Sequence, residues 1–175
     1  MALLKVIHTQ STSAPSGQRK YHDDHAFHDV VSYVLNPAKT PQGFIGGYGV
    51  NVAHAAFEME LLSQSFGKDK GLRLRHMELS FSPSEAKCFH TRVYHALYKI
   101  ASYVCQYYAD EYQIVFAVHE DTDHPHIHFV MNCVNYRTGL KYRGDKADYY
   151  RFQSYVRGFL QEYYGLPLIV VADHG

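Results

Sequence analysis

The sequence predicts an α+β domain in which helices pack on a central antiparallel β-sheet of about five strands. Short apolar runs suited to strands are mixed with longer stretches in which apolar residues recur at helical spacing. The two kinds of segment do not alternate strictly, which favours an α+β arrangement. A chain of 175 residues can bury one substantial core, so residues 1–175 are expected to form a single domain.

The chain begins with a strand and an amphipathic helix. Residues 2–9 (ALLKVIHT) have the apolar character of a strand, and a polar, serine-rich loop follows through about Gln18. A helix is expected from about Asp24 to Leu35, because apolar side chains recur there at offsets of three, four, seven and eight. Asn36-Pro37 should end this helix, since a residue before proline disfavours helical backbone.

The middle of the chain predicts two more helices around one strand. A glycine-rich segment, GFIGGYGVN, precedes a helix expected over Ala53 to Phe66 and ended by Gly67. Residues 74–81 (LRHMELSF) are expected to form a strand. A serine cap, a proline at the first helical position and a glutamate three residues after the cap then start a helix. This helix, from Pro83 to about Ala109, should be the longest element.

Two strands and a helix complete the expected elements. Residues 112–120 (YQIVFAVHE) and 125–134 (PHIHFVMNCV) are separated by an acidic, polar turn, which favours an antiparallel hairpin. The last helix should span about Lys146 to Tyr164 and end at Gly165.

The stretch HEDTDHPHIHFVMN, residues 119–132, carries the clearest chemical signal. It holds four of the chain's 13 histidines within ten positions. Because side chains alternate between the two faces of a strand, His126, His128 and Asn132 should share one face. The residues between them are apolar and should face the core.

These histidines could bind a metal ion. Imidazoles two residues apart on one strand can reach the same ion, and His119, at the end of the preceding strand, can approach as a third ligand. Three neutral ligands leave the ion's charge unquenched, which suits the polarisation of a phosphoryl oxygen. Asp121 or Asp123 could orient a ligand histidine through its other nitrogen. A His-x-His pair alone is more often a polar strand edge, but the third histidine and the acidic neighbours favour a metal site.

Composition leaves the question of nucleic-acid binding open. Seventeen Lys and Arg balance 17 Asp and Glu, so net charge does not indicate a nucleic-acid partner. Locally, Arg137, Lys141 and Arg143 alternate with tyrosines in YRTGLKYRGDK, which is either a DNA-binding segment or a solvated loop. No apolar run approaches the roughly 20 residues that a membrane span needs. Three widely spaced cysteines favour free buried thiols and a cytoplasmic protein.

Three motifs in order resemble those of plasmid mobilization relaxases, within the wider class of HUH endonucleases. VHEDTDHPHIHFVMN resembles the third relaxase motif, and VVSYVLNPAKT (residues 30–40) and RHMELSFSPSE (residues 75–85) match the first and second. The resemblance spans most of the chain and implies the HUH endonuclease fold.

The resemblance also implies roles for individual residues. In this family the first motif carries the nucleophilic tyrosine, which maps onto Tyr33, and the second carries a serine that positions DNA, which maps onto Ser80. The third carries the metal ligands, which map onto His119, His126 and His128, with His126 also the candidate general base.

The residues themselves are compatible with this role for Tyr33. At 100° per residue, Tyr33 falls about 130° from the middle of its helix's apolar stripe, so it should be accessible. Tyr21 is the local alternative for the nucleophile, and Asn132 either orients a histidine or satisfies backbone groups.

The implied function is a relaxase of the bacterial cytoplasm, a metal-dependent DNA endonuclease. Tyr33 would cut single-stranded DNA at an origin of transfer, form a 5′-phosphotyrosine and later rejoin strands in plasmid mobilization. Mg²⁺ or Mn²⁺ is the implied cofactor, although three imidazoles favour softer ions in competition. Accessory relaxosome proteins and the coupling and secretion machinery are the implied partners.

Other functions remain open from the sequence. They are a rolling-circle replication initiator, an HUH transposase, a metallo-phosphohydrolase that uses water, and a domain with a structural zinc ion.

Overall fold

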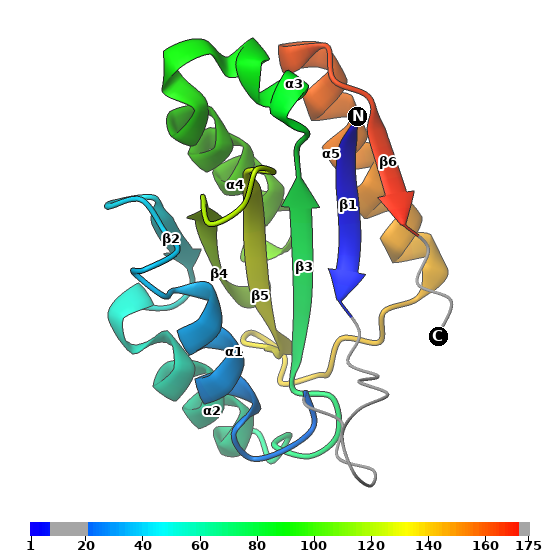
Figure 1. Cartoon of the computed structure of the whole chain (residues 1–175). Coiled ribbons are helices and arrows are strands. Elements are labelled where there is room, and N and C mark those ends of the chain that lie inside the picture. The colour runs from blue at the N-terminus through cyan, green and yellow to red at the C-terminus, as the bar shows by residue number, and fades with distance from the viewer. Residues whose placement is uncertain (8–20, 172–175) are drawn as a thin grey trace, which may run out of the picture.

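A six-stranded mixed β-sheet lies between two layers of helices (Figure 1). The computed structural model describes residues 1–7 and 21–171. The strands are β1 (Ala2–Ile7), β2 (Ile45–Tyr48), β3 (Leu74–Ser80), β4 (Tyr112–His119), β5 (His126–Asn135) and β6 (Leu168–Val171). The helices are α1 (Ala26–Val34), α2 (Ala55–Ser65), α3 (Pro83–Ala86), α4 (Val93–Ala109) and α5 (Lys146–Tyr164), with 3₁₀ turns η1 (Val52–His54) and η2 (Lys87–Arg92). The predicted α+β class is confirmed.

The strands lie in the order β2-β4-β5-β3-β1-β6, and every pair is antiparallel except β1 with β6. The predicted antiparallel hairpin of β4 and β5 is observed, and β5 and β3 are the two central strands of the sheet. The sequence analysis did not predict β2 and β6, which have four residues each. Neither segment is long enough to show a strand's alternation, and β2 contains two glycines.

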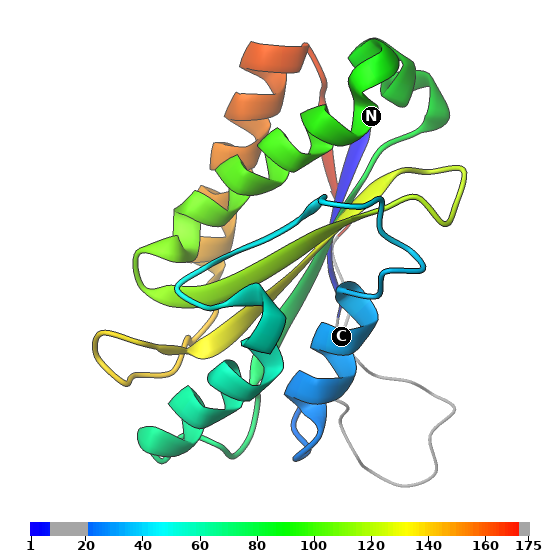
Figure 2. The same cartoon turned by 90° about the vertical axis from the view of Figure 1, so that its left-hand side faces the viewer.

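Helices cover both faces of the sheet (Figure 2), and each face has its own apolar core. On one face, α4 and α5 cover the alternate residues of the central strands, among them Ile127, Phe129 and Met131 of β5. On the other face, α1 and α2 cover a smaller core that includes Val115 of β4 and Val130 of β5. The period of two along a strand therefore assigns neighbouring residues to different helical layers.

The prediction of one long helix from Pro83 to Ala109 is wrong. Residues 83–109 instead form α3, the 3₁₀ turn η2 and α4, and the longest helix is α5 with 19 residues. The chain turns at η2 because Phe89 is buried there, with its ring centroid 5.6 Å from Phe81 and 5.4 Å from Tyr164. Tertiary packing of one aromatic ring thus overrides local helix propensity, and no glycine or proline marks the break.

Other expected boundaries agree closely with the structure. Helix α5 has the predicted bounds and ends at Gly165, whose φ of +64° is the left-handed cap that glycine favours. The predicted first strand is observed through Ile7, and the rest of it and the loop to Gln18 lie outside the described residues. Cys105 and Cys133 are free and buried as expected, whereas Cys88 is exposed. Within the described ranges, no helix has the length and apolar character of a membrane span.

Alanine substitutions at two glycines test this packing, because they should change the free energy of unfolding in opposite directions. A Cβ at Gly46 of β2 would lie 2.4 Å from the ring of buried Phe116, whereas a Cβ at Gly158 in α5 would meet nothing within 4 Å. We expect Gly46→Ala to lower the free energy of unfolding by about 1–3 kcal/mol through overpacking. Gly158→Ala should raise it by about 0.5–1 kcal/mol through helix propensity. Urea denaturation of both variants measures the two changes, and a neutral Gly46→Ala would contradict the described β2–β4 packing.

Candidate metal and nucleophile site

Three histidine side chains meet on the face of the sheet that α1 covers. His119 ends β4, His126 and His128 lie at the start of β5, and the register places His119 opposite His126. All three residues are buried, and their ligand nitrogen atoms lie within 4.8 Å of one another. The alternation predicted for residues 126–132 is therefore observed.

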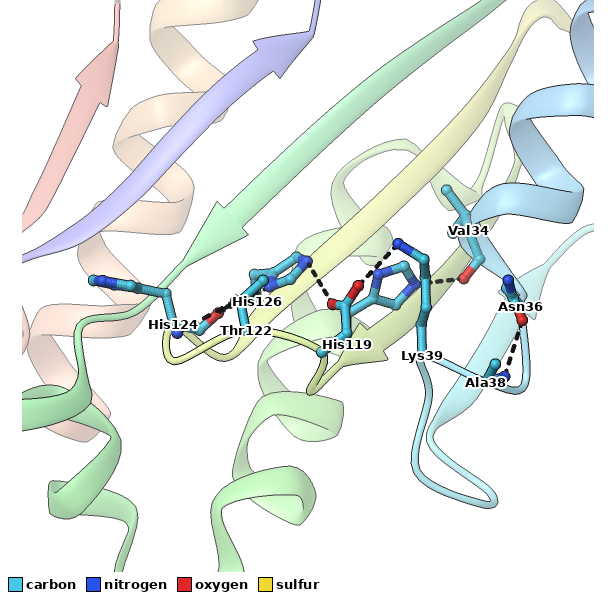
Figure 3. Close-up of polar contacts among 9 residues, drawn as sticks. Val34, Asn36, Ala38, Lys39, His119, Thr122, His124 and His126 are labelled. Atoms are coloured by element: carbon cyan, nitrogen blue, oxygen red, sulfur yellow. Dashed lines mark hydrogen bonds and ion pairs between the residues drawn. The ribbon is translucent and has the colours of Figure 1, made fainter.

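Backbone carbonyl groups fix the orientation of two of these rings (Figure 3). His119 Nε2 lies 2.7 Å from the carbonyl oxygen of Val34, and His126 Nδ1 lies 2.9 Å from that of His124. A carbonyl oxygen only accepts hydrogen bonds, so these two nitrogens carry the protons. His119 Nδ1 and His126 Nε2 are therefore left with lone pairs for a ligand.

A third histidine outside the predicted set orients His128. Nδ1 of His128 lies 3.0 Å from Nε2 of His76, whose Nδ1 lies 2.9 Å from the hydroxyl oxygen of Tyr21. For His128 Nε2 to hold a metal ion, the proton of this ring must be on Nδ1, from which it is donated to His76. His76 then carries its own proton on Nδ1 and donates it to Tyr21.

Burial keeps the rings of His119 and His128 neutral. Desolvation lowers the pKa of His128 to about 2 and lowers that of His119, so neither ring is charged at neutral pH. Among the described residues, His119 Nδ1 and His128 Nε2 are buried without a hydrogen-bond partner. Buried nitrogens without partners are unfavourable. Binding of one cation would satisfy both, so the three residues fit a metal ion.

Tyr33 lies beside the three histidines in the last turn of α1. Its ring centroid is 5.6 Å from that of His128 and 6.0 Å from that of His119. The side chain is 42% exposed, as its position on the helical wheel predicts. The alternative nucleophile, Tyr21, is buried, and burial raises the pKa of its phenol. The structure therefore places Tyr33, and not Tyr21, where a substrate can reach it.

The turn after α1 brings a cation next to Tyr33. Asn36 accepts hydrogen bonds from Ala38 N (2.9 Å) and Lys39 N (3.0 Å), which folds the chain back after the helix. Lys39 Nζ then lies 4.6 Å from the ring centroid of Tyr33 and 2.8 Å from Asp121 Oδ2. This hydrogen bond raises the pKa of Lys39 and lowers that of Asp121.

The two predicted aspartates do not contact the outer nitrogens of the histidines, which are the ring nitrogens that face away from the metal position. Asp121 Oδ1 is 3.8 Å from His126 Nε2, the nitrogen that would face the ion. Asp123 lies in the exposed turn between β4 and β5. The outer nitrogens are held by two carbonyl groups and His76.

The remaining predicted residues fall in three places. Ser80 lies opposite His126 in the register of β3 and β5, on the histidine face. Asn132 is farther along β5, where its Nδ2 donates to Met59 O and Gln113 Oε1, which matches the alternative that it satisfies other polar groups. Arg137 and Lys141 donate to backbone carbonyls, Arg137 to Asp110 and Lys141 to Lys70 and Leu72. Arg143 lines a separate cavity.

His76 and Lys39 are the site residues that the sequence analysis missed. His76, Glu78 and Ser80 occupy every second position of β3, so the period of two along a strand puts His76 on the same face as Ser80. No comparable signal marks Lys39, because a loop turn and not a strand delivers it.

Comparisons with known proteins agree with the geometry. A family model described as relaxase, MobA/VirD2-like, nuclease domain matches residues 33–165. A curated relative, Protein rlx from Staphylococcus aureus, is 28% identical over 116 residues, which are 66% of this chain and 34% of the relative. The chain thus spans about a third of the length of that relative. No solved structure matches significantly.

Metal binding should depend on the three histidines. We expect isothermal titration of metal-stripped protein with Mn²⁺ or Ni²⁺ to show one ion per chain. Binding should be lost in His119→Ala and His128→Ala, because each variant removes one nitrogen ligand. His124→Ala is the matched control, since only the backbone of His124 holds His126. Equal binding by all three variants would exclude this site.

His76 should tune the affinity of the same site. His76→Phe removes the partner of His128 Nδ1 while it keeps a ring in place. Loss of an outer partner of a metal ligand typically weakens metal affinity 10- to 100-fold, and we expect a loss in that range. Tyr21→Phe should have a smaller effect in the same titration, because it removes only the next hydrogen bond. Unchanged affinity in His76→Phe would show that His128 is oriented by packing alone.

Proposed function

The chain belongs to the MobA/VirD2-like relaxase nuclease family, and on this premise we propose that it nicks single-stranded DNA at an origin of transfer and later rejoins the strands. The observation that best supports this proposal is the position of Tyr33. Its side chain is exposed and lies beside three histidines whose ligand nitrogens lie within 4.8 Å of one another. This arrangement suits transfer of a phosphodiester from DNA to the protein.

His119 Nδ1, His126 Nε2 and His128 Nε2 would hold the divalent ion, which we propose to be Mg²⁺ or Mn²⁺. When bound, it would act as a Lewis acid on a non-bridging oxygen of the scissile phosphate. Three imidazoles suit Mn²⁺ better than Mg²⁺, which prefers oxygen ligands.

The proposed reaction exchanges one phosphodiester for another. The deprotonated Tyr33 oxygen attacks phosphorus, a bond from that oxygen to phosphorus forms, and the bond from phosphorus to the 3′-oxygen breaks. The 3′-oxygen leaves with the bonding electron pair and takes a proton, which gives a 5′-phosphotyrosine and a free 3′-hydroxyl. Because a phosphodiester is present on both sides, the step is close to isoenergetic and the same residues can run it in reverse.

Lys39 is placed to stabilise the phenolate. A phenol with an ordinary pKa near 10 needs about 4 kcal/mol to ionise at pH 7. Lys39 Nζ lies 4.6 Å from the centroid of the Tyr33 ring, so its positive charge favours the phenolate. Asp121 Oδ2, 2.8 Å from the same nitrogen, offsets part of that charge.

His126 serves as a ligand in this scheme. It was also expected to act as the general base, but its Nδ1 donates to His124 O, so Nε2 can either hold the ion or take a proton. We therefore assign the acceptance of the phenolic proton to water, which reaches the exposed side of Tyr33.

The proposed setting follows from the family. A single backbone must reach Tyr33, so the target would be single-stranded or locally extruded. In this scheme Ser80, which lies opposite His126 on the same face, would contact that strand. We propose accessory relaxosome proteins and coupling or secretion proteins as partners, and the bacterial cytoplasm as the location.

Adduct formation tests the proposed chemistry. The protein would be incubated with Mn²⁺ and single-stranded oligonucleotides that tile the mobile element encoding it, and resolved on denaturing gels. We expect a protein–DNA adduct that chelation and Tyr33→Phe both abolish, because each removes a group that the transfer needs. Tyr163→Phe, on an exposed tyrosine of α5, is the matched control. Cleavage without an adduct would indicate a water-dependent hydrolase, and an adduct in Tyr33→Phe would refute the assignment of Tyr33.

A further inference from the structure

A second feature near the site is a cavity of about 560 Å³ at the end of the sheet. Its walls come from the end of β1, the start of β3, the segment that joins β5 to α5, and the first turns of α5. This segment crosses beneath β3 and β1 in Figure 1. Tyr21 lines the cavity, and its hydroxyl contacts His76 beside the metal-binding histidines. Tyr21 and His76 therefore link the cavity to His128 through two hydrogen bonds.

The cavity concentrates positive charge in a chain whose formal net charge is zero. Arg75, Arg143 and Lys146 line it, and its described lining residues include no aspartate or glutamate. Such a lining attracts anions. Because the chain as a whole is formally neutral, these three cations leave the other residues with a net formal charge of −3.

Aromatic rings form the other part of the lining. Tyr142, Tyr149 and Tyr150 border the cavity together with Tyr21. Tyr150 is 63% exposed, so a ligand can reach its ring. Tyrosine rings interleaved with cations are typical of surfaces that stack nucleobases and bind phosphates.

The guanidinium of Arg75 is held rigidly in this wall. Its Nη1 donates to the hydroxyl oxygens of Tyr108 (3.0 Å) and Tyr142 (2.6 Å), and the group lies 5.3 Å from the ring centroid of Tyr149. Tyr142 in turn donates to Asp148 (2.6 Å). This network fixes both a cation and a ring before any ligand arrives, which lowers the entropic cost of binding.

We propose that this cavity binds one nucleotide of the single-stranded DNA substrate, with the base stacked on Tyr150 and the phosphate near Arg143 and Lys146. The volume falls in the range of small-molecule sites, and the lining supplies the aromatic and cationic groups that a nucleotide requires. The proposal rests on the proposed function, because it assigns the nucleotide to the strand that Tyr33 attacks. Of the three cations that the sequence suggested for DNA binding, the proposal gives this role only to Arg143. Arg137 and Lys141 donate hydrogen bonds to backbone carbonyls elsewhere.

Two pairs of variants test the proposal in the full chain. Tyr150→Ala removes the stacking ring and Arg143→Ala removes a phosphate contact. Tyr163→Ala and Arg157→Ala are the matched controls, because both residues are exposed on α5 and neither lines the cavity. Fluorescence anisotropy would measure binding of oligo(dT) and of an abasic oligomer of the same length, with Mn²⁺ present.

We expect Tyr150→Ala to weaken oligo(dT) binding about 5- to 100-fold, in line with loss of one base–aromatic stack. The abasic oligomer has no base to stack, so its affinity should be the same for Tyr150→Ala and the unsubstituted chain. Arg143→Ala should weaken binding of both oligomers and reduce the slope of log affinity against log salt by about 0.7. The two controls should bind as the unsubstituted chain does.

Three results would overturn the proposal. They are affinities of Tyr150→Ala and Arg143→Ala equal to those of the controls, an equal loss for both oligomers in Tyr150→Ala, and no binding of oligo(dT) by the unsubstituted chain. None of these results bears on the adduct at Tyr33. Conversely, absence of any adduct with normal oligo(dT) binding would refute the proposed chemistry and leave the nucleotide site in place.

Discussion

The antiparallel pairing of β4 with β5 is the constraint on which the site depends. It places His119 opposite His126 and leaves His128 on the same face two residues further along β5. A slip of one residue would turn the histidines of one strand to the opposite face and scatter the three nitrogens. Burial of Ile127 and Phe129 under α4 and α5 opposes such a slip. The apolar core on one face therefore fixes the polar constellation on the other.

The end of α1 connects the proposed nucleophile to the proposed metal ligands. Val34 accepts the hydrogen bond that orients His119, and Tyr33, one residue earlier, lies over the same rings. Asn36-Pro37 ends the helix at this point and returns Lys39 to the ring of Tyr33. One helix terminus thus sets the positions of His119, Tyr33 and Lys39, so small movements of α1 would affect all three together.

The periodicity of the sequence correctly predicted the features of the fold that depend on a few neighbouring residues. Alternation along residues 126–132 and the helical position of Tyr33 gave the correct faces, because strand and helix periods act over a few residues. The four-residue strands β2 and β6 and the break at Phe89 depend on partners far along the chain, so no local pattern showed them. Lys39 was missed because it acquires its role from a contact across the fold. The period of two along β3 places His76 on the histidine face, but only the fold shows that it contacts His128.

The central claim is that Tyr33 becomes covalently joined to DNA beside a three-histidine metal site. Its most direct test is mass spectrometry of the protein after reaction with origin DNA, removal of excess DNA by nuclease and proteolysis. The account predicts a nucleotide mass on the peptide that contains Tyr33, with fragmentation that assigns the phosphate to that tyrosine. A nucleotide on Tyr21 or on any other residue would contradict the account.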